Sequence, residues 1–236
     1  HIHSALYWQQ NKDIYQWQRG VSRPNFNRTV LFGGRVKAMC DWIGGRSSAA
    51  LEVRNEDLTS TSLGDSLAVK HEIGDSEGLY VLGRVRTLLS LNVEHSVAYR
   101  RLSVSGGFMA HKDLKGSTGM HVYPGVDVSY RLRRDWRVYA SWNTSMRMPS
   151  FTELYYSVDG HKADRNLKAE RMQAVEIGSK YASEYGEGLV SLYYHDGRDM
   201  IDWIMDMSKL KEERIWTSVN HAQIHSFGIE LSGRLD

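Results

Sequence analysis

The chain has 236 residues, which is enough for one large domain or two small ones. Its 30 basic and 28 acidic residues leave a formal net charge of +2, and without a long basic run this balance gives no argument for nucleic acid as a partner. The single cysteine, Cys40, excludes an internal disulfide and a cysteine-based zinc site. No apolar run approaches the ~18 residues of a membrane-spanning helix, which excludes helical spans only.

Apolar and polar residues alternate with a period of two along most of the chain, which is the pattern of strands with two different faces. Between 136 and 142, for example, Trp136, Val138 and Trp142 share one face and Arg137 lies on the other. No long window shows the recurrence at three and four residues that a helix requires. The alternation predicts about ten strands, near 2–18, 28–43, 46–58, 79–98, 101–111, 121–131, 136–147, 170–182, 188–200 and 216–235.

Connections of two lengths alternate between these expected strands. Short turns fall at 44–45, 99–100, 132–135 and 183–187, and longer polar loops fall near 19–27, 59–78, 112–120, 148–169 and 201–215. A soluble sandwich has no reason to alternate in this way, whereas outer-membrane barrels have short periplasmic turns and long extracellular loops. The fold class that follows is all-β, an antiparallel transmembrane β-barrel.

Aromatic side chains gather on the apolar face beside the short turns. They are Trp42, Tyr99, Tyr130, Trp136 and Tyr181. Amphipathic rings at one end of the strands are typical of the girdle at a membrane interface, although Tyr and Trp also simply favour strands. On the opposite face we expect charges to compensate one another in a wet lumen. The groups are Glu52 with Arg54, Glu176 with Lys180, and Asp127 with Arg131 and Arg137.

The ten histidines invite a metal site, but their spacing does not support one. His221 and His225 lie ~13 Å apart along a strand, too far to share an ion directly. His195 and Asp196 could form an orienting pair of the kind metal sites use, yet no cysteine or carboxylate group accompanies them. We therefore expect neither a metal nor a cofactor.

Motifs of known enzyme classes are also missing. No G-x-S-x-G, P-loop, G-x-G-x-x-G or H-E-x-x-H pattern occurs, so we expect a protein that is not an enzyme. A protease-like site built from His195, Asp199 and Asp202 at the outer end of one strand stays open as an alternative.

The long loops hold aromatic side chains that are candidates for ligand contact. Rigid amphipathic rings give contact area at low entropic cost, so the ligand-binding residues that we expect are Tyr155, Tyr156 and Trp203. Packing within the loops, or an outer girdle, is the other interpretation.

One segment resembles a family signature. Residues Arg147-Met148-Pro149-Ser150-Phe151-Thr152-Glu153-Leu154-Tyr155-Tyr156, followed by Asn166-Leu167-Lys168-Ala169-Glu170, resemble the late-barrel pattern R-x-P-S/T-F-x-E/D-L-Y and N-P-x-L-K-P-E of TonB-dependent outer-membrane receptors. The second part departs from the pattern, because its first proline is absent and Ala169 replaces the second. We expect Pro149, Glu153 and Lys168 to shape the exit and re-entry of the strands rather than to bind ligand.

The resemblance implies a plugged barrel of about 22 strands, of which this chain would supply about ten. We expect residues 1–236 to be an internal part of one β-barrel domain, without the plug and the remaining strands. The implied function is TonB-dependent uptake, at the bacterial outer membrane, of a bulky scarce ligand such as a corrinoid (cobalamin) or a metal chelate (siderophore). The implied partners are that ligand, a TonB-type energy-coupling protein acting through the missing plug, outer-membrane lipid and a surface lipoprotein.

Two other functions stay open at this point. One is an intact ten-stranded outer-membrane barrel that acts as a pore or a protease. The other is a soluble all-β binding module.

Overall fold

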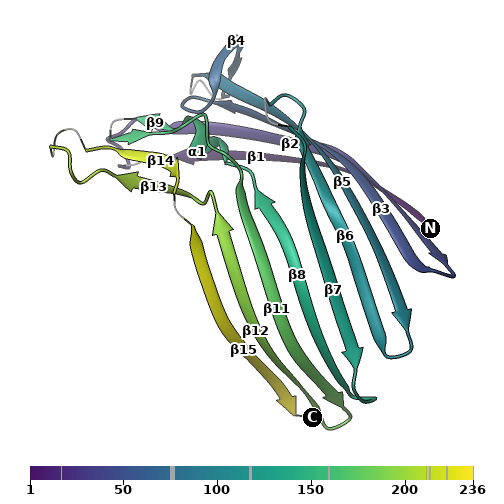
Figure 1. Cartoon of the computed structure of the whole chain (residues 1–236). Helices are drawn as coiled ribbons and strands as arrows, with labels where there is room; N and C mark the ends of the chain where they lie inside the picture. Colours follow the sequence, from purple (N-terminus) through teal and green to yellow (C-terminus); the bar gives the residue numbers. More distant parts are fainter. Residues whose placement is uncertain are drawn as a thin grey trace.

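The strands form a curved, antiparallel sheet of 11 strands that stands as an open wall (Figure 1). The computed structural model describes residues 1–16, 18–74, 78–116, 119–158, 160–210, 212, 214–221 and 223–235. Ten strands follow one another along the wall: β1 (Ile2–Tyr15), β2 (Asn25–Trp42), β3 (Gly45–Ser60), β5 (Leu79–Tyr99), β6 (Leu102–Asp113), β7 (His121–Arg131), β8 (Trp136–Arg147), β11 (Glu170–Ser183), β12 (Gly186–Arg198) and β15 (Ile224–Leu235). The remaining strand, β4 (Asp65–Glu72), pairs with β5 off this path.

A second, smaller sheet lies at the long-loop end of the wall (Figure 1). Its four strands run in the order β13 (Ile201–Met205), β14 (Trp216–Asn220), β10 (His161–Lys162) and β9 (Ser157–Val158). The parallel pairing of β10 with β14 joins the loop after β8 to the loop after β12. A single turn of helix, α1 (Phe151–Tyr155), precedes β9. Among the described residues, no helix has the length and apolar character needed to cross a membrane.

The period-two pattern predicted the wall strands to within a few residues, and the alternation of long and short connections is confirmed. Two kinds of expectation were wrong. The expected loops near 59–78, 148–169 and 201–215 contain short strands, which are β4, β9 with β10, and β13, respectively. The strand expected at 216–235 is two strands of different sheets. β14 ends at Asn220, and the chain enters the large sheet again at Ile224, where β15 begins. The His221 N–H still donates to the Met200 carbonyl at 2.6 Å, in register with the pairing of β14 with β13. The first strand ends at Tyr15, and position 17 of its expected range lies outside the described residues.

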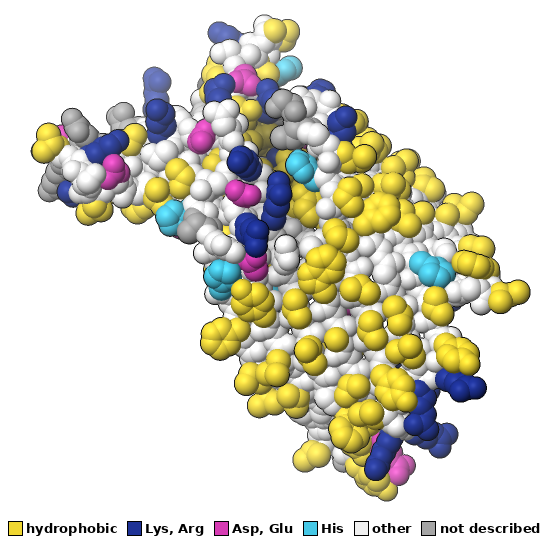
Figure 2. Space-filling view, viewed as in Figure 1, with side chains coloured by type: hydrophobic (Ala, Val, Ile, Leu, Met, Phe, Trp, Pro, Cys, Tyr) yellow, Lys and Arg dark blue, Asp and Glu magenta, His cyan; other side chains and the backbone are white. Residues whose placement is uncertain are grey.

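The outer face of the wall is apolar, as the alternation predicted. Trp142 pairs with Val175, which pairs in turn with Tyr194, so the three side chains share one face. Their exposed fractions are 36%, 40% and 44% although all three are large and apolar. Figure 2 shows hydrophobic side chains spread over the strands on this face. An exposed apolar band of this extent suits lipid as the surrounding medium.

The expected aromatic girdle is where the sequence placed it. Its five members are all exposed and all lie at the strand ends beside the short turns: Trp42, Tyr99, Tyr130, Trp136 and Tyr181. The pairing of Trp136 with Tyr181 sets these two rings side by side on the outer face.

The inner face carries tyrosines that lie over glycines of the neighbouring strand. The three pairs are Tyr7 over Gly33, Tyr139 over Gly178 and Tyr193 over Gly228, and a Cβ on any of these glycines would collide with the ring. The Tyr7 and Tyr139 hydroxyls each donate to a carboxylate, those of Glu52 and Glu176, at 2.6 Å. Aromatic side chains over glycines fix the register of neighbouring strands.

The expected compensation of charges on the inner face is largely wrong. Arg54 pairs with Glu56 at 2.7 Å, and not with Glu52. Arg137 faces Arg131 on one side and Lys180 on the other, and no ion pair of these three is found among the described residues. For Glu176 with Lys180 and Asp127 with Arg131 the reason is distance, because residues four apart on one strand are separated by ~13 Å. The neighbours of Arg137 are set by register, because cross-strand partners are in contact range.

The ends of the wall do not meet. β1 and β15 occupy opposite ends of the hydrogen-bonded path, and no pairing joins them among the described residues. This open sheet argues against the alternative of an intact ten-stranded barrel.

Candidate functional site

The segment after β8 turns inward through a capped helical turn. Ser150 is the N-cap of α1: its Oγ accepts a hydrogen bond from the Glu153 backbone N–H, and the Glu153 carboxylate accepts one from the Ser150 N–H at 2.7 Å. This reciprocal arrangement satisfies two backbone donors that a helix start otherwise leaves free. The S-x-x-E part of the sequence motif therefore builds the turn that carries residues 151–155 off the strand.

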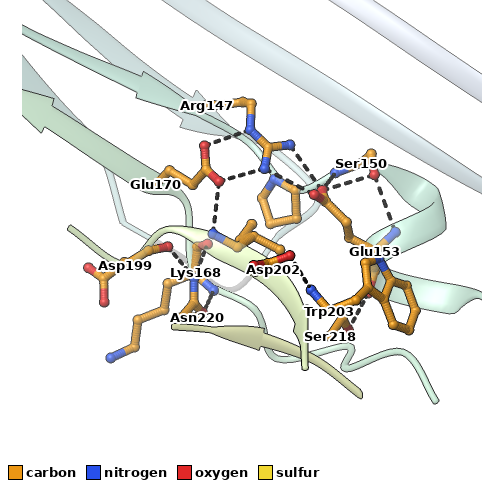
Figure 3. A network of polar contacts seen from close by, with 12 residues as sticks. Arg147, Ser150, Glu153, Lys168, Glu170, Asp199, Asp202, Trp203, Ser218 and Asn220 are labelled. Carbon is orange, nitrogen blue, oxygen red and sulfur yellow. Dashed lines mark hydrogen bonds and ion pairs between the residues drawn. The ribbon is translucent and has the colours of Figure 1, made fainter. Parts of the chain in front are cut away.

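Arg147, the last residue of β8, joins three pieces of chain (Figure 3). Its Nε and Nη2 donate to the Glu170 carboxylate, both at 2.6 Å, and its Nη1 and Nη2 donate to the Glu153 carboxylate, both at 3.0 Å. The two carboxylates are 9% and 16% exposed, respectively, so Arg147 balances two largely buried charges. The end of β8, the start of β11 and α1 are thereby held together.

The environment of Glu153 favours its ionised form. Burial raises the pKa of this carboxyl, but hydrogen bonds from Arg147 and Ser150 outweigh burial, and the net pKa lies below the usual value. Glu170 extends the same network, because its Oε1 also accepts from the Ile201 N–H at 2.8 Å, where β13 begins.

Two residues of β14 complete the connection between the loops (Figure 3). Asn220 accepts from the Lys168 N–H at 2.8 Å and donates to the carbonyls of Lys168, at 3.0 Å, and Asp199, at 2.6 Å. Ser218, fully buried, accepts from the Asp164 N–H at 2.7 Å and donates to the Glu153 carbonyl at 2.8 Å. Glu153 and Lys168 therefore shape the loop that joins the strands, the latter through its backbone.

An aromatic cluster lies beside this network. The ring centroid of Tyr156 is 5.9 Å from that of His161 and 6.5 Å from that of Trp203, and His161 and Trp203 are 5.8 Å apart. The three rings line a cavity of about 590 Å³, within the usual size of a small-molecule site. The other lining residues are Asp13, Tyr15, Asn25, Asn27, Ser62, Leu63, Thr152 and Trp216.

The cavity opens on the inner face of the wall at its long-loop end. Asp13 pairs with Asn27 and Tyr15 pairs with Asn25, and these pairs share the inner face with Tyr7 and Gly33. Asn27 also donates to the Asp13 carboxylate at 2.8 Å. The cavity thus has a rigid side made of strands and an aromatic side made of loops.

The structure brings together two of the three ligand-contact residues that the sequence predicted. Tyr156 and Trp203 line the cavity, but Tyr155 lies in a separate one of about 440 Å³. There the Arg165 guanidinium is 5.1 Å from the centre of the Tyr155 ring and also pairs with Asp65 at 2.6 Å. Tyr155 and Tyr156, although consecutive in sequence, therefore line different cavities.

Sequence reasoning missed several lining residues. Asp13 and Tyr15 come from β1, more than a hundred residues before Trp203, and only their position on the polar face near a long loop could have marked them. His161 was passed over because a single loop histidine carries no spacing signal.

The protease-like alternative finds no assembled site. His195 stacks on Tyr193, with ring centroids 4.9 Å apart, and no hydrogen bond joins it to Asp199 or Asp202 in the described part of the chain. Nor do His195 and Asp196 pair, because consecutive strand residues point to opposite faces. Asp196 accepts hydrogen bonds from Gln223 and Arg198 instead, at 2.7 and 3.0 Å. No group of three or more potential metal ligands occurs among the described residues.

Several solved structures that match this fold are named as receptors or transporters. The FrpB iron transporter from Neisseria meningitidis matches with a TM-score of 0.70 and 14% identity, over 100% of this chain and 39% of that chain. The copper transporter OprC matches with a TM-score of 0.71 and 16% identity, over 100% and 41%. A mutant (G324V) of the ferric enterobactin receptor PfeA from Pseudomonas aeruginosa matches with a TM-score of 0.72 and 13% identity, over 98% and 38%.

The chain spans about two fifths of the length of these structures. No curated protein sequence matches it. A family model described as TonB dependent receptor-like, beta-barrel matches residues 5–236, which agrees with the signature at 147–170 and with the wall of antiparallel strands. The chain therefore belongs to the TonB-dependent receptor β-barrel family, whose members are receptors and transporters of the bacterial outer membrane and not enzymes.

Proposed function

We propose that the receptor containing this chain imports a bulky, scarce ligand across the outer membrane by TonB-dependent uptake. The 236 residues would be part of one barrel domain that further strands and a plug complete, and the energy-coupling partner would act through the plug. The observation that carries the proposal is the aromatic cavity, because it lies on the inner face where the long loops meet the wall.

The lining of the cavity favours certain ligands over others. Among the described residues that line it, Asp13 is the one acidic residue and none is a lysine or arginine. A polyanionic chelate would therefore meet a carboxylate and no compensating cation, at an electrostatic cost. Tyr156, His161 and Trp203 offer ring faces and edges instead. We propose a ligand that is neutral or cationic and carries flat apolar surface, such as a corrinoid or an uncharged metal chelate.

The test compares two adjacent tyrosines and one tryptophan in the whole receptor. Binding of cyanocobalamin, a neutral ferric hydroxamate and an anionic ferric catecholate would be measured by titration calorimetry. We expect one of the first two probes to bind, and Trp203→Ala and Tyr156→Ala to weaken it about tenfold, as loss of an aromatic anchor does. Tyr155→Ala is the matched control. It should change affinity less than about twofold, because Tyr155 does not line the cavity that holds Tyr156 and Trp203.

Two results would contradict the proposal. One is preferential binding of the anionic catecholate. The other is an equal loss of affinity in Tyr155→Ala and Tyr156→Ala, which would mean that the cavity is not the place of capture.

A further inference from the structure

Two neighbouring short turns carry a concentration of arginine that the uptake function does not use. Segments 99–102 and 130–137 together contain six arginines and one acidic residue, Asp135. The arginines, all exposed, are Arg100, Arg101, Arg131, Arg133, Arg134 and Arg137. Arg131 and Arg137 face each other on the inner face of the wall, and the other four lie in or beside the turns. We call these two segments the basic turn pair. None of the ion pairs found among the described residues involves any of its arginines.

The two turns lie side by side. Leu102 pairs with Tyr130, so the end of β7 is the neighbour of the start of β6. The Arg131 N–H donates to the Arg101 carbonyl at 2.8 Å, and the Arg101 guanidinium donates to the Leu132 carbonyl at 3.3 Å. Figure 2 shows lysine and arginine side chains gathered at the short-turn end, below the hydrophobic side chains. The positive charge is therefore one patch and not two isolated turns.

The other two short turns do not share this charge. At the turn between β2 and β3, Arg46 is paired with Asp41 at 2.5 Å. The segment 183–187 between β11 and β12 carries Glu184 and Glu187 and no cation. The excess of arginine is thus a local feature of the wall, and not a general property of its short-turn end.

The basic turn pair borders the lipid-facing band. Tyr99, Tyr130 and Trp136 lie on the outer face directly beside these turns, where amphipathic rings mark the level of the lipid headgroups. The Arg100 guanidinium is 5.2 Å from the centre of the Tyr99 ring, which holds it at that level. Leu102, which pairs with Tyr99 and Tyr130, is 40% exposed, and Val128, two residues from Tyr130 along β7, is 39% exposed. Both offer apolar surface to acyl chains.

We propose that the basic turn pair binds the phosphate headgroup of an anionic phospholipid in the periplasmic leaflet of the outer membrane. The planar guanidinium matches phosphate oxygens with two parallel hydrogen bonds, and unpaired arginines near a membrane surface attract anionic lipid. Lipid fits better than an acidic protein, because Arg100, Arg101, Arg133 and Arg134 lie at the end of the wall next to a surface that faces acyl chains.

The test uses the whole receptor, purified in detergent and mixed with phosphatidylglycerol or with phosphatidylethanolamine, and read by native mass spectrometry. We expect retained phosphatidylglycerol on the unmodified receptor, and its loss in the Arg133→Gln/Arg134→Gln double variant. The Arg100→Gln/Arg101→Gln double variant, on the neighbouring turn, should also lose phosphatidylglycerol. It replaces the first variant in the test if that variant does not fold. Arg46→Gln is the matched control, because it removes an arginine from another short turn, and it should retain the lipid.

Several outcomes would overturn the proposal. Undiminished retention of phosphatidylglycerol in a folded double variant is one, and equal retention of zwitterionic phosphatidylethanolamine is another. Binding of inorganic phosphate without retention of phosphatidylglycerol would assign the site to a free anion. Loss of the lipid in Arg46→Gln would show a non-specific charge effect.

Discussion

The strand wall and the loop cap, residues 148–169 and 199–223, are held together by different kinds of contact. In the wall, nearly every strand pairs with its neighbours in the chain through backbone ladders. In the cap, side chains bridge long sequence distances: 52 residues between Lys168 and Asn220, 65 between Glu153 and Ser218, and 100 between Asp65 and Arg165. The wall depends on alternation, which many sequences satisfy, whereas the cap depends on particular side chains.

This difference matters for function, because the proposed ligand cavity has one side of each kind. Asp13 and Asn27 stand on wall strands, while Tyr156 and Trp203 stand on cap segments. A change that loosens the cap should therefore open the cavity without destabilising the wall. A change within the wall should destabilise the strands and leave the contacts within the cap intact.

Arg147→Ala should have the largest effect on the cap. It leaves the largely buried carboxylates of Glu153 and Glu170 without their cation. We expect a local loss of about 2–3 kcal/mol, less than for a fully buried pair because Arg147 is half exposed. Hydrogen exchange of the whole receptor should show faster exchange in 148–169 and 199–223, with unchanged exchange in β5 to β7.

Arg46→Ala is the control for that measurement. The two side chains of its pair with Asp41 are 64% and 56% exposed, so the loss of this pair should leave the protection of the cap unchanged. Equal protection of the cap in Arg147→Ala and in the unmodified receptor would contradict the role given to Arg147.

Gly178→Val should affect the wall and spare the cap. The new side chain displaces the Tyr139 ring and breaks its 2.6 Å hydrogen bond to Glu176. Overpacking of this kind costs about 1–3 kcal/mol. Samples of the whole receptor heated to different temperatures before gel electrophoresis should shift from folded to unfolded migration at a lower temperature in the variant than in the unmodified receptor. Gly106→Val is the matched control, because the nearest neighbour of its Cβ is 3.8 Å away; a similar loss there would refute the specific role of the tyrosine and glycine pair.

Acid should weaken the cap by a smaller amount. Because the folded state lowers the pKa of Glu153, ionised Glu153 stabilises the cap fully above the ordinary carboxyl pKa of about 4.3. That contribution is lost as the pH falls through the lower folded-state pKa. Limited proteolysis between pH 7 and pH 3 should show increased cleavage in 148–169 at the acid end, and Glu153→Gln should reduce the dependence. Constant cleavage across this pH range would contradict the stabilising role given to ionised Glu153.

Much of the wall could be predicted because the alternation of apolar and polar residues within each strand distinguishes its outer face from its inner face. Trp136, Val138 and Trp142 identify an outer face without reference to any other strand, and the short turn at 132–135 identifies the neighbour. The interruption at Asn220 could not be predicted in the same way, because the side chain binds backbone groups of Lys168 and Asp199, which lie far away in sequence.

The sequence by itself determined the fold class, the family and the direction of each strand's apolar face, since period-two alternation and the 147–170 signature are local properties of the chain. Only the tertiary structure decided that Tyr156 and Trp203 share a cavity while Tyr155 does not, and that Arg137 faces Arg131 and Lys180 rather than Asp127. The physical reason is that such neighbours are set by strand register and loop contacts between distant segments, which no short stretch of sequence encodes.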